Sequence, residues 1–247
     1  MTPEEFYGDI DRCSQTHEWD GTDSRKRYKS NSVKQLHQLK KFGWVGAKIT
    51  YDFNSYGFRS AEFEEGDSIV FLGCSHTFGA GLPKENTFAD IVAKHFNLAN
   101  YNLGIPGGSM GTCFKLAYYW IPILKPKYVV LACPDRTRFS IIKNGGYEDH
   151  LKASHIESRE YKDYTRFYKR YINNDYNPGL DYFKNLYGIR YICSQHNIPI
   201  VDFEINKLYD SYDDQLIKRD YARDLQHRGV KTHQRVADMI VKQIDKL

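Results

Sequence analysis

The pattern of apolar and polar positions changes near residue 65. Before that point the chain is polar and irregular, with one amphipathic segment that predicts a helix at residues 32–42. After it, short apolar runs rich in β-branched residues predict buried strands at residues 68–72, 101–103, 128–132 and 200–203. Apolar residues that recur every three or four positions predict helices at residues 87–96, 110–124, 180–196 and 230–244. Because strands that alternate with helices form βαβ units, we expect a three-layer α/β/α domain with a central parallel sheet.

Two segments fall outside this regular pattern. We expect residues 1–64 to form an extension that packs on a core domain of residues 65–247. The second segment is a tyrosine-rich insertion at about residues 140–179, in which four tyrosines are spaced as on one helical face. They are Tyr161, Tyr164, Tyr168 and Tyr171. This face either packs an inserted helix onto the domain or forms a lid whose rings stack on a sugar or another flat ligand.

Composition and charge argue against several classes of protein. The net charge of the 247 residues is only +4, and a basic cluster at residues 25–29 is diluted by Asp20 and Asp23, which favours a solvated loop over a nucleic-acid site. No apolar run approaches the roughly 20 residues of a membrane span, and the acidic start has no apolar leader. We therefore expect a cytoplasmic protein. Five cysteines without a CxxC pair favour neither a disulfide framework nor structural zinc, and we expect no metal or cofactor.

A serine follows the first predicted strand of the core domain. Ser75 stands in the segment Gly73–Gly79, at the carboxyl end of the strand, where ligands of parallel α/β sheets bind. A serine in a tight strand-to-helix turn exposes its hydroxyl beside free backbone N–H groups, which can stabilise a developing oxyanion. The same pattern also fits a serine that only caps the next helix, and the residues alone leave both interpretations open.

A carboxylate and an imidazole stand near the end of the chain. Asp224 and His227 follow the last predicted strand and precede the last helix, which places them at the same edge of the sheet as Ser75. A serine nucleophile needs a general base, and that base needs an orienting carboxylate. On its own, Asp-x-x-His is also common on protein surfaces.

These segments together resemble the SGNH, or GDSL-like, hydrolase family, over roughly residues 50–247. The resemblance is carried by residues 73–79, 102–107 and 224–237, with a further similarity at residues 54–60 to a segment of polysaccharide-acyl members. It implies an SGNH/flavodoxin-like fold.

The resemblance also implies roles for individual residues. Ser75 would be the nucleophile, His227 its general base and Asp224 the orienting carboxylate. The backbone N–H groups of Ser75 and Gly104 would line the oxyanion hole.

The segment after the third strand departs from the family pattern. The family has an Asn there whose side chain donates to the oxyanion, whereas residues 132–139 of this chain contain none. Losing one such donor typically costs about 10²–10³ in rate. We expect Asp135 and Arg136 at the oxyanion or substrate-binding site, with the guanidinium of Arg136 replacing the missing amide. The alternative is that Arg136 pairs structurally with Asp135 or another acid.

The function implied by the resemblance is a serine ester hydrolase that acts through an acyl-serine. Small acyl groups are favoured, with O-acetyl esters of carbohydrates as the expected substrates, so the expected partner is a small-molecule or glycan acyl ester. Acyl transfer to another alcohol would use the same groups. The missing Asn motivates an alternative: a weakly active or inactive SGNH-fold binding or structural module. The segment after the third strand is similar to that of some phage-borne relatives, which implies a phage particle as one such setting and a virion-associated protein if a phage encodes it.

Overall fold

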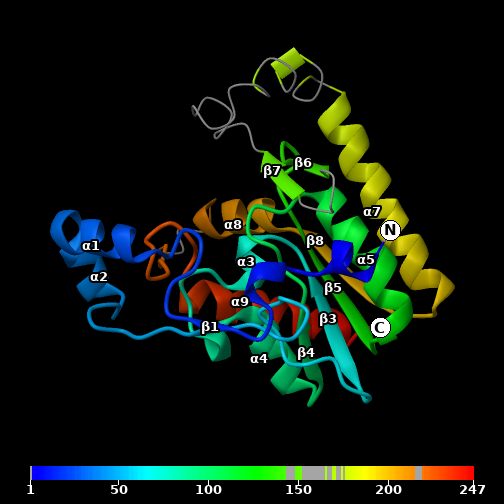
Figure 1. Cartoon of the computed structure of the whole chain (residues 1–247), viewed down its shortest axis with the longest axis horizontal. Helices are drawn as coiled ribbons and strands as arrows, with labels where there is room; N and C mark the ends of the chain where they lie inside the picture. Colours follow the sequence, from blue (N-terminus) through cyan, green and yellow to red (C-terminus); the bar gives the residue numbers. More distant parts are fainter. Residues whose placement is uncertain are drawn as a thin grey trace.

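A four-stranded parallel sheet forms the centre of the protein. The computed structural model describes residues 2–142, 148–151, 165, 169–170, 174, 176–214 and 219–247. The strand order is β4–β3–β5–β8, and every neighbouring pair is parallel (Figure 1). The strands are β3 (Ser68–Leu72), β4 (Ala99–Asn102), β5 (Tyr128–Cys133) and β8 (Ile200–Glu204). The four predicted strands and their parallel arrangement are thus confirmed.

Helices cover both faces of the sheet (Figure 1). Along β3, Val70 and Leu72 pack into the cluster formed with α5 (Met110–Leu124) and α7 (Asn177–Gln195). The alternate residues Ile69 and Phe71 pack into the opposite cluster, which contains residues of α4 (Phe88–His95) and α9 (Val230–Ile244). Because successive side chains of a strand point to opposite faces, a strand buried on both sides is apolar throughout. The three-layer α/β/α architecture is therefore confirmed.

Shorter elements connect these layers. They are α3 (Ser75–Phe78), η3 (Lys84–Asn86), α8 (Ile205–Asp214) and the antiparallel pair β6 (Phe139–Ile142) and β7 (Glu148–Leu151). The pair β6–β7 was not expected from the sequence, and it places Glu148 against α5, where Lys115 Nζ lies 2.6 Å from its Oε2. The tyrosine stripe predicted in this region lies outside the described residues.

The N-terminal segment shares a hydrophobic cluster with the domain. Its elements are η1 (Pro3–Phe6), η2 (Ile10–Arg12), β1 (Thr16–His17), α1 (Arg25–Lys34), α2 (Leu36–Lys41) and β2 (Tyr51–Asp52). Trp44 and Tyr51 pack in one buried cluster with Phe78 and Leu82. Within the described residues, no helix is both long enough and apolar enough to span a membrane.

The prediction of a single helix at residues 32–42 is wrong, because two helices cover this part of the chain. The chain leaves the helical conformation at Gln35 (φ −137°, ψ 32°), so α1 ends there and α2 starts one residue later. The apolar stripe that suggested one helix is not a buried face, because Val33 is 84% exposed while Leu39 is fully buried.

Candidate active site

Ser75 lies at the junction of β3 and α3. Gly73 makes this sharp turn possible, because a Cβ at this position would collide with Thr77 Oγ1 and lie 2.9 Å from the carbonyl oxygen of Ala132. Ser75 is the first residue of α3, so its backbone N–H has no acceptor inside the helix. The serine is therefore held at the carboxyl edge of the sheet, with its own amide beside its hydroxyl.

Asp224 and His227 lie on a loop that closes on itself before α9. The backbone N–H of Ala222 donates to the carbonyl oxygen of His227 at 3.0 Å, which joins the two ends of the loop. Asp224 Oδ1 accepts the backbone N–H groups of Gln226 at 2.9 Å and of His227 at 3.0 Å. These bonds fix the carboxylate and the imidazole relative to each other.

The three residues form a connected chain of hydrogen bonds. Ser75 Oγ lies 2.8 Å from His227 Nε2, and His227 Nδ1 lies 2.6 Å from Asp224 Oδ2. Both distances are within the range of good hydrogen bonds. The structure therefore brings together the serine, histidine and aspartate that the sequence suggested, although the serine and the histidine are separated by 152 residues along the chain.

The charge on Asp224 fixes the direction of these bonds. Burial raises the pKa of this carboxyl, but the hydrogen bond and charge of His227 and the two backbone N–H groups outweigh burial and lower the pKa to about 2. An ionised carboxylate only accepts hydrogen bonds, so His227 Nδ1 carries the proton that it donates to Asp224. In the neutral imidazole, His227 Nε2 then has a free lone pair that accepts the hydrogen bond of the Ser75 hydroxyl.

Thr22 adds a fourth group that sequence reasoning missed. Its Oγ1 donates to Asp224 Oδ2 at 2.8 Å and lies 3.4 Å from His227 Nδ1. Thr22 precedes Asp224 by 202 residues and belongs to no motif that would have singled it out.

Gly104 lies next to α3, but its amide is engaged. Its N–H donates to Asn102 Oδ1 at 2.9 Å, while Asn102 Nδ2 donates to the carbonyl oxygen of Thr77 at 2.8 Å. The Gly104 N–H, which was expected to line the oxyanion hole, is therefore bonded to the Asn102 side chain in this structure. A Cβ at Gly104 would lie 2.5 Å from the backbone N of Phe78, so close packing against α3 accounts for the glycine.

Arg136 and Asp135 do not line the cleft that contains Ser75. Arg136 Nη2 lies 2.7 Å from Glu204 Oε1, and its guanidinium lies over the ring of Tyr182 at 4.8 Å. Asp135 accepts the backbone N–H of Thr137 at 2.8 Å and the amide of Asn206 at 2.9 Å. Arg136 thus lies outside the Ser75 cleft and pairs with a neighbouring acid, which was the alternative, although the acid is Glu204 and not Asp135.

Arg138 is the arginine of this segment that lines the Ser75 cleft. Its Nη1 donates a long hydrogen bond, 3.4 Å, to the carbonyl oxygen of Gly108. The sequence analysis placed Arg136 in this cleft, whereas the structure places Arg138 there, two positions further along the chain.

The cleft has a volume of about 530 Å³ and is lined by Ser75, His227 and Thr22. Two further histidines, His76 and His150, also line it. One of these, His76, has its pKa well below the usual value because of burial and the nearby charge of His227. Its Nδ1 lies 3.3 Å from the hydroxyl of Tyr209, so this ring nitrogen contacts Tyr209 and not Ser75.

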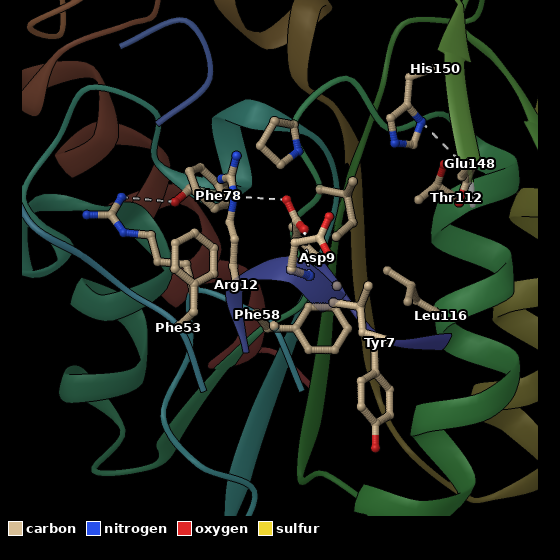
Figure 2. A pocket seen from close by; sticks show the side chains of 18 of the residues that line it. Tyr7, Asp9, Arg12, Phe53, Phe58, Phe78, Thr112, Leu116, Glu148 and His150 are labelled. Atoms are coloured by element: carbon tan, nitrogen blue, oxygen red, sulfur yellow. Dashed lines mark hydrogen bonds and ion pairs between the residues drawn. The ribbon is translucent and has the colours of Figure 1, made fainter. Parts of the chain in front are cut away.

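A second cavity of about 410 Å³ adjoins the cleft. The two share wall residues that include Gly21, Pro106 and His150. Figure 2 shows this cavity between the N-terminal residues Tyr7 and Arg12 and a polar group on the opposite wall. That group consists of Thr112, Glu148 and His150.

Fold and site together define a three-layer α/β protein with a Ser–His–Asp arrangement at the carboxyl edge of its sheet.

No family model and no curated protein matches the chain. The chain is similar to solved structures of esterases. They include a lipase/acylhydrolase from Enterococcus faecalis (18% identity, 72% of this chain and 95% of that one, TM-score 0.37). Another is the acetyl xylan esterase AlAXEase, with 15% identity over 72% of this chain and 99% of that one and a TM-score of 0.37. A third is the SGNH-hydrolase family esterase AlinE4, with 15% identity over 74% of this chain and 97% of that one and a TM-score of 0.29.

Proposed function

We propose that this protein is a serine ester hydrolase that acts through an acyl-serine. The observation that carries the proposal is the pair of hydrogen bonds joining Ser75 Oγ, His227 and Asp224, at 2.8 and 2.6 Å. A serine hydroxyl bonded to an imidazole that is itself oriented by an ionised carboxylate is the arrangement that activates serine for attack on a carbonyl.

The reaction uses the protein's own groups in two stages. Ser75 Oγ bonds to the ester carbonyl carbon while its proton passes to His227 Nε2, and the tetrahedral intermediate then breaks its bond to the alcohol oxygen. His227 gives its proton to the leaving alcohol. A water molecule then attacks the acyl carbon and loses a proton to Nε2, after which the acid leaves and Ser75 regains its proton.

Fewer hydrogen-bond donors are positioned to stabilise the oxyanion than the family pattern implies. The Ser75 N–H has no acceptor inside α3, whereas the Gly104 N–H is bonded to Asn102. In our proposal Arg138 supplies positive charge in the cleft, because this residue lines the cleft and its guanidinium donates one long hydrogen bond to a carbonyl.

We propose carbohydrate acetyl esters as the substrate class. The family resemblance favours small acyl groups, and the second cavity provides a place for the alcohol part of the ester. Its walls combine apolar side chains such as Phe58 and Leu116 with polar groups such as Glu148, which suits the apolar faces and hydroxyl edges of a sugar.

The proposal is tested by acid release from aryl acetate and from acetylated sugars. We expect turnover in the wild type, none in Ser75→Ala and none in His227→Ala, with the melting temperature of His227→Ala close to that of wild type. Turnover that persists in Ser75→Ala would contradict the acyl-serine mechanism. A large loss of stability in His227→Ala would mean that the histidine has a structural role instead.

A second candidate is a binding module of the same fold with little turnover. The observations that favour it are the absence of the Asn after β5 and the engagement of the Gly104 amide. For this module we expect Ser75→Ala to retain wild-type affinity for an acetylated oligosaccharide while neither protein releases acetate.

A further inference from the structure

A tight turn in the N-terminal extension reaches into the cleft. The backbone N–H groups of Asp20 and Asp23 each donate to the carbonyl oxygen of the other residue, at 3.0 and 2.9 Å. This closes a turn with Gly21 (φ +50°) and Thr22 at its tip, and both tip residues line the cleft beside Ser75. The extension is therefore part of the wall of the site.

A buried ion pair holds this turn against the loop that carries Asp224. Arg223 Nη2 lies 2.6 Å from Asp23 Oδ2, and both side chains are almost completely buried. Arg223 also donates to the carbonyl oxygens of Glu18 at 2.8 Å and Ala47 at 3.1 Å, while Tyr51 donates to Asp23 Oδ2 at 2.6 Å. Because Arg223 directly precedes Asp224, these contacts fix the position of Thr22 relative to the Asp224 carboxylate.

The hydroxyl of Thr22 completes the set of donors around that carboxylate. Asp224 Oδ1 accepts two backbone N–H groups, and Oδ2 accepts His227 Nδ1–H and the Thr22 hydroxyl. A donor on the side of Oδ2 restricts rotation of the carboxylate and stabilises its charged form. Both effects keep His227 aimed at Ser75.

We propose that Thr22 is a positioning residue for Asp224, His227 and Ser75, so that the N-terminal extension contributes a residue to the active site. This inference rests on the proposed ester hydrolase function. Thr22 acts through Asp224 and touches no reacting atom, so its loss should affect the rate of the chemical step more than substrate binding.

The test compares Thr22→Val, which removes the hydroxyl but keeps the shape, with Thr22→Ser, which keeps the hydroxyl. We expect Thr22→Val to lower kcat for an aryl acetate about tenfold with KM within about twofold of wild type. Thr22→Ser should restore kcat to within about twofold of wild type. The matched control is Thr16→Val, because Thr16 donates a hydrogen bond of the same length, 2.8 Å, to a carboxylate of the extension outside the cleft.

The outcomes separate this inference from the proposed function. A wild type that turns over ester, together with wild-type kcat in Thr22→Val, would overturn the positioning role alone. A Thr22→Ser variant as slow as Thr22→Val would also overturn it, because the hydroxyl would then not be the group that matters. If Thr22→Val loses its fold, Thr22→Ala provides the same comparison, and wild-type kcat in that variant would refute the inference. Wild type without Ser75-dependent turnover would instead refute the proposed function.

Discussion

At the scale of single residues, the Asp224 carboxylate has the most complete set of partners in the site. Four donors reach its two oxygens, and the side chain is almost fully buried. Burial alone would raise its pKa, and the donors together lower it to about 2 from 3.8. This shift links the charge of Asp224 to the stability of the folded protein.

The shift predicts how stability depends on pH. Because the pKa in the folded protein lies below the unfolded value, the ionised Asp224 stabilises the fold above about pH 4, and this contribution is lost as pH falls towards 2. A shift of this size is worth about 2 kcal/mol.

Urea unfolding of wild type and Asp224→Asn between pH 7 and pH 2 measures this effect. We expect the free-energy difference between the two proteins to shrink by about 2 kcal/mol over the lower part of the range. A difference that stays constant from pH 5 to pH 2 would contradict the assigned charge.

At the scale of elements, the ends of parallel strands explain which site residues the sequence could reveal. Ser75 follows β3 directly, and the Asp224–His227 loop precedes α9, so both motifs stand beside strongly periodic segments. Their convergence could therefore be predicted. The rotation of a side chain after a strand end has no such periodicity, which is why Arg136 was expected where Arg138 lies.

The contrast between these two arginines leads to a test of the segment after β5. Arg138→Ala should lower kcat/KM for ester about tenfold or more, because it removes the positive charge that lines the Ser75 cleft. Arg136→Ala is the matched control, because Arg136 pairs with Glu204 outside that cleft, and its kinetics should stay within about twofold of wild type. Equal losses in both variants, or a loss only in Arg136→Ala, would refute this assignment.

At the scale of the whole molecule, the extension and the domain meet around the loop that carries Asp224. Figure 1 shows α1 beside this loop, and Asn31 of α1 donates to the carbonyl oxygen of Asp224 at 3.2 Å. Trp44 Nε1 donates to the carbonyl oxygen of Tyr221 at 2.7 Å. In both bonds a side chain of the extension donates to a backbone carbonyl of the loop.

These long-range contacts are the part of the site that the sequence could not reveal. The layered sheet followed from local periodicity, since each strand and helix carries its own apolar pattern. Thr22 and Asp23 lie in a polar segment without periodicity, and their partners Asp224 and Arg223 are about 200 residues away. Pairing over such a separation is determined by packing and not by any pattern within the segment.

The central claim is that Ser75 is an activated nucleophile, and reaction with a fluorophosphonate probe tests it most directly. Intact-mass and peptide measurements should find one adduct per chain, located on Ser75, and none in Ser75→Ala. The same adduct should form much more slowly in His227→Ala, because the hydroxyl then lacks its base. A folded wild-type protein that forms no adduct, or forms it equally in Ser75→Ala, would contradict the account.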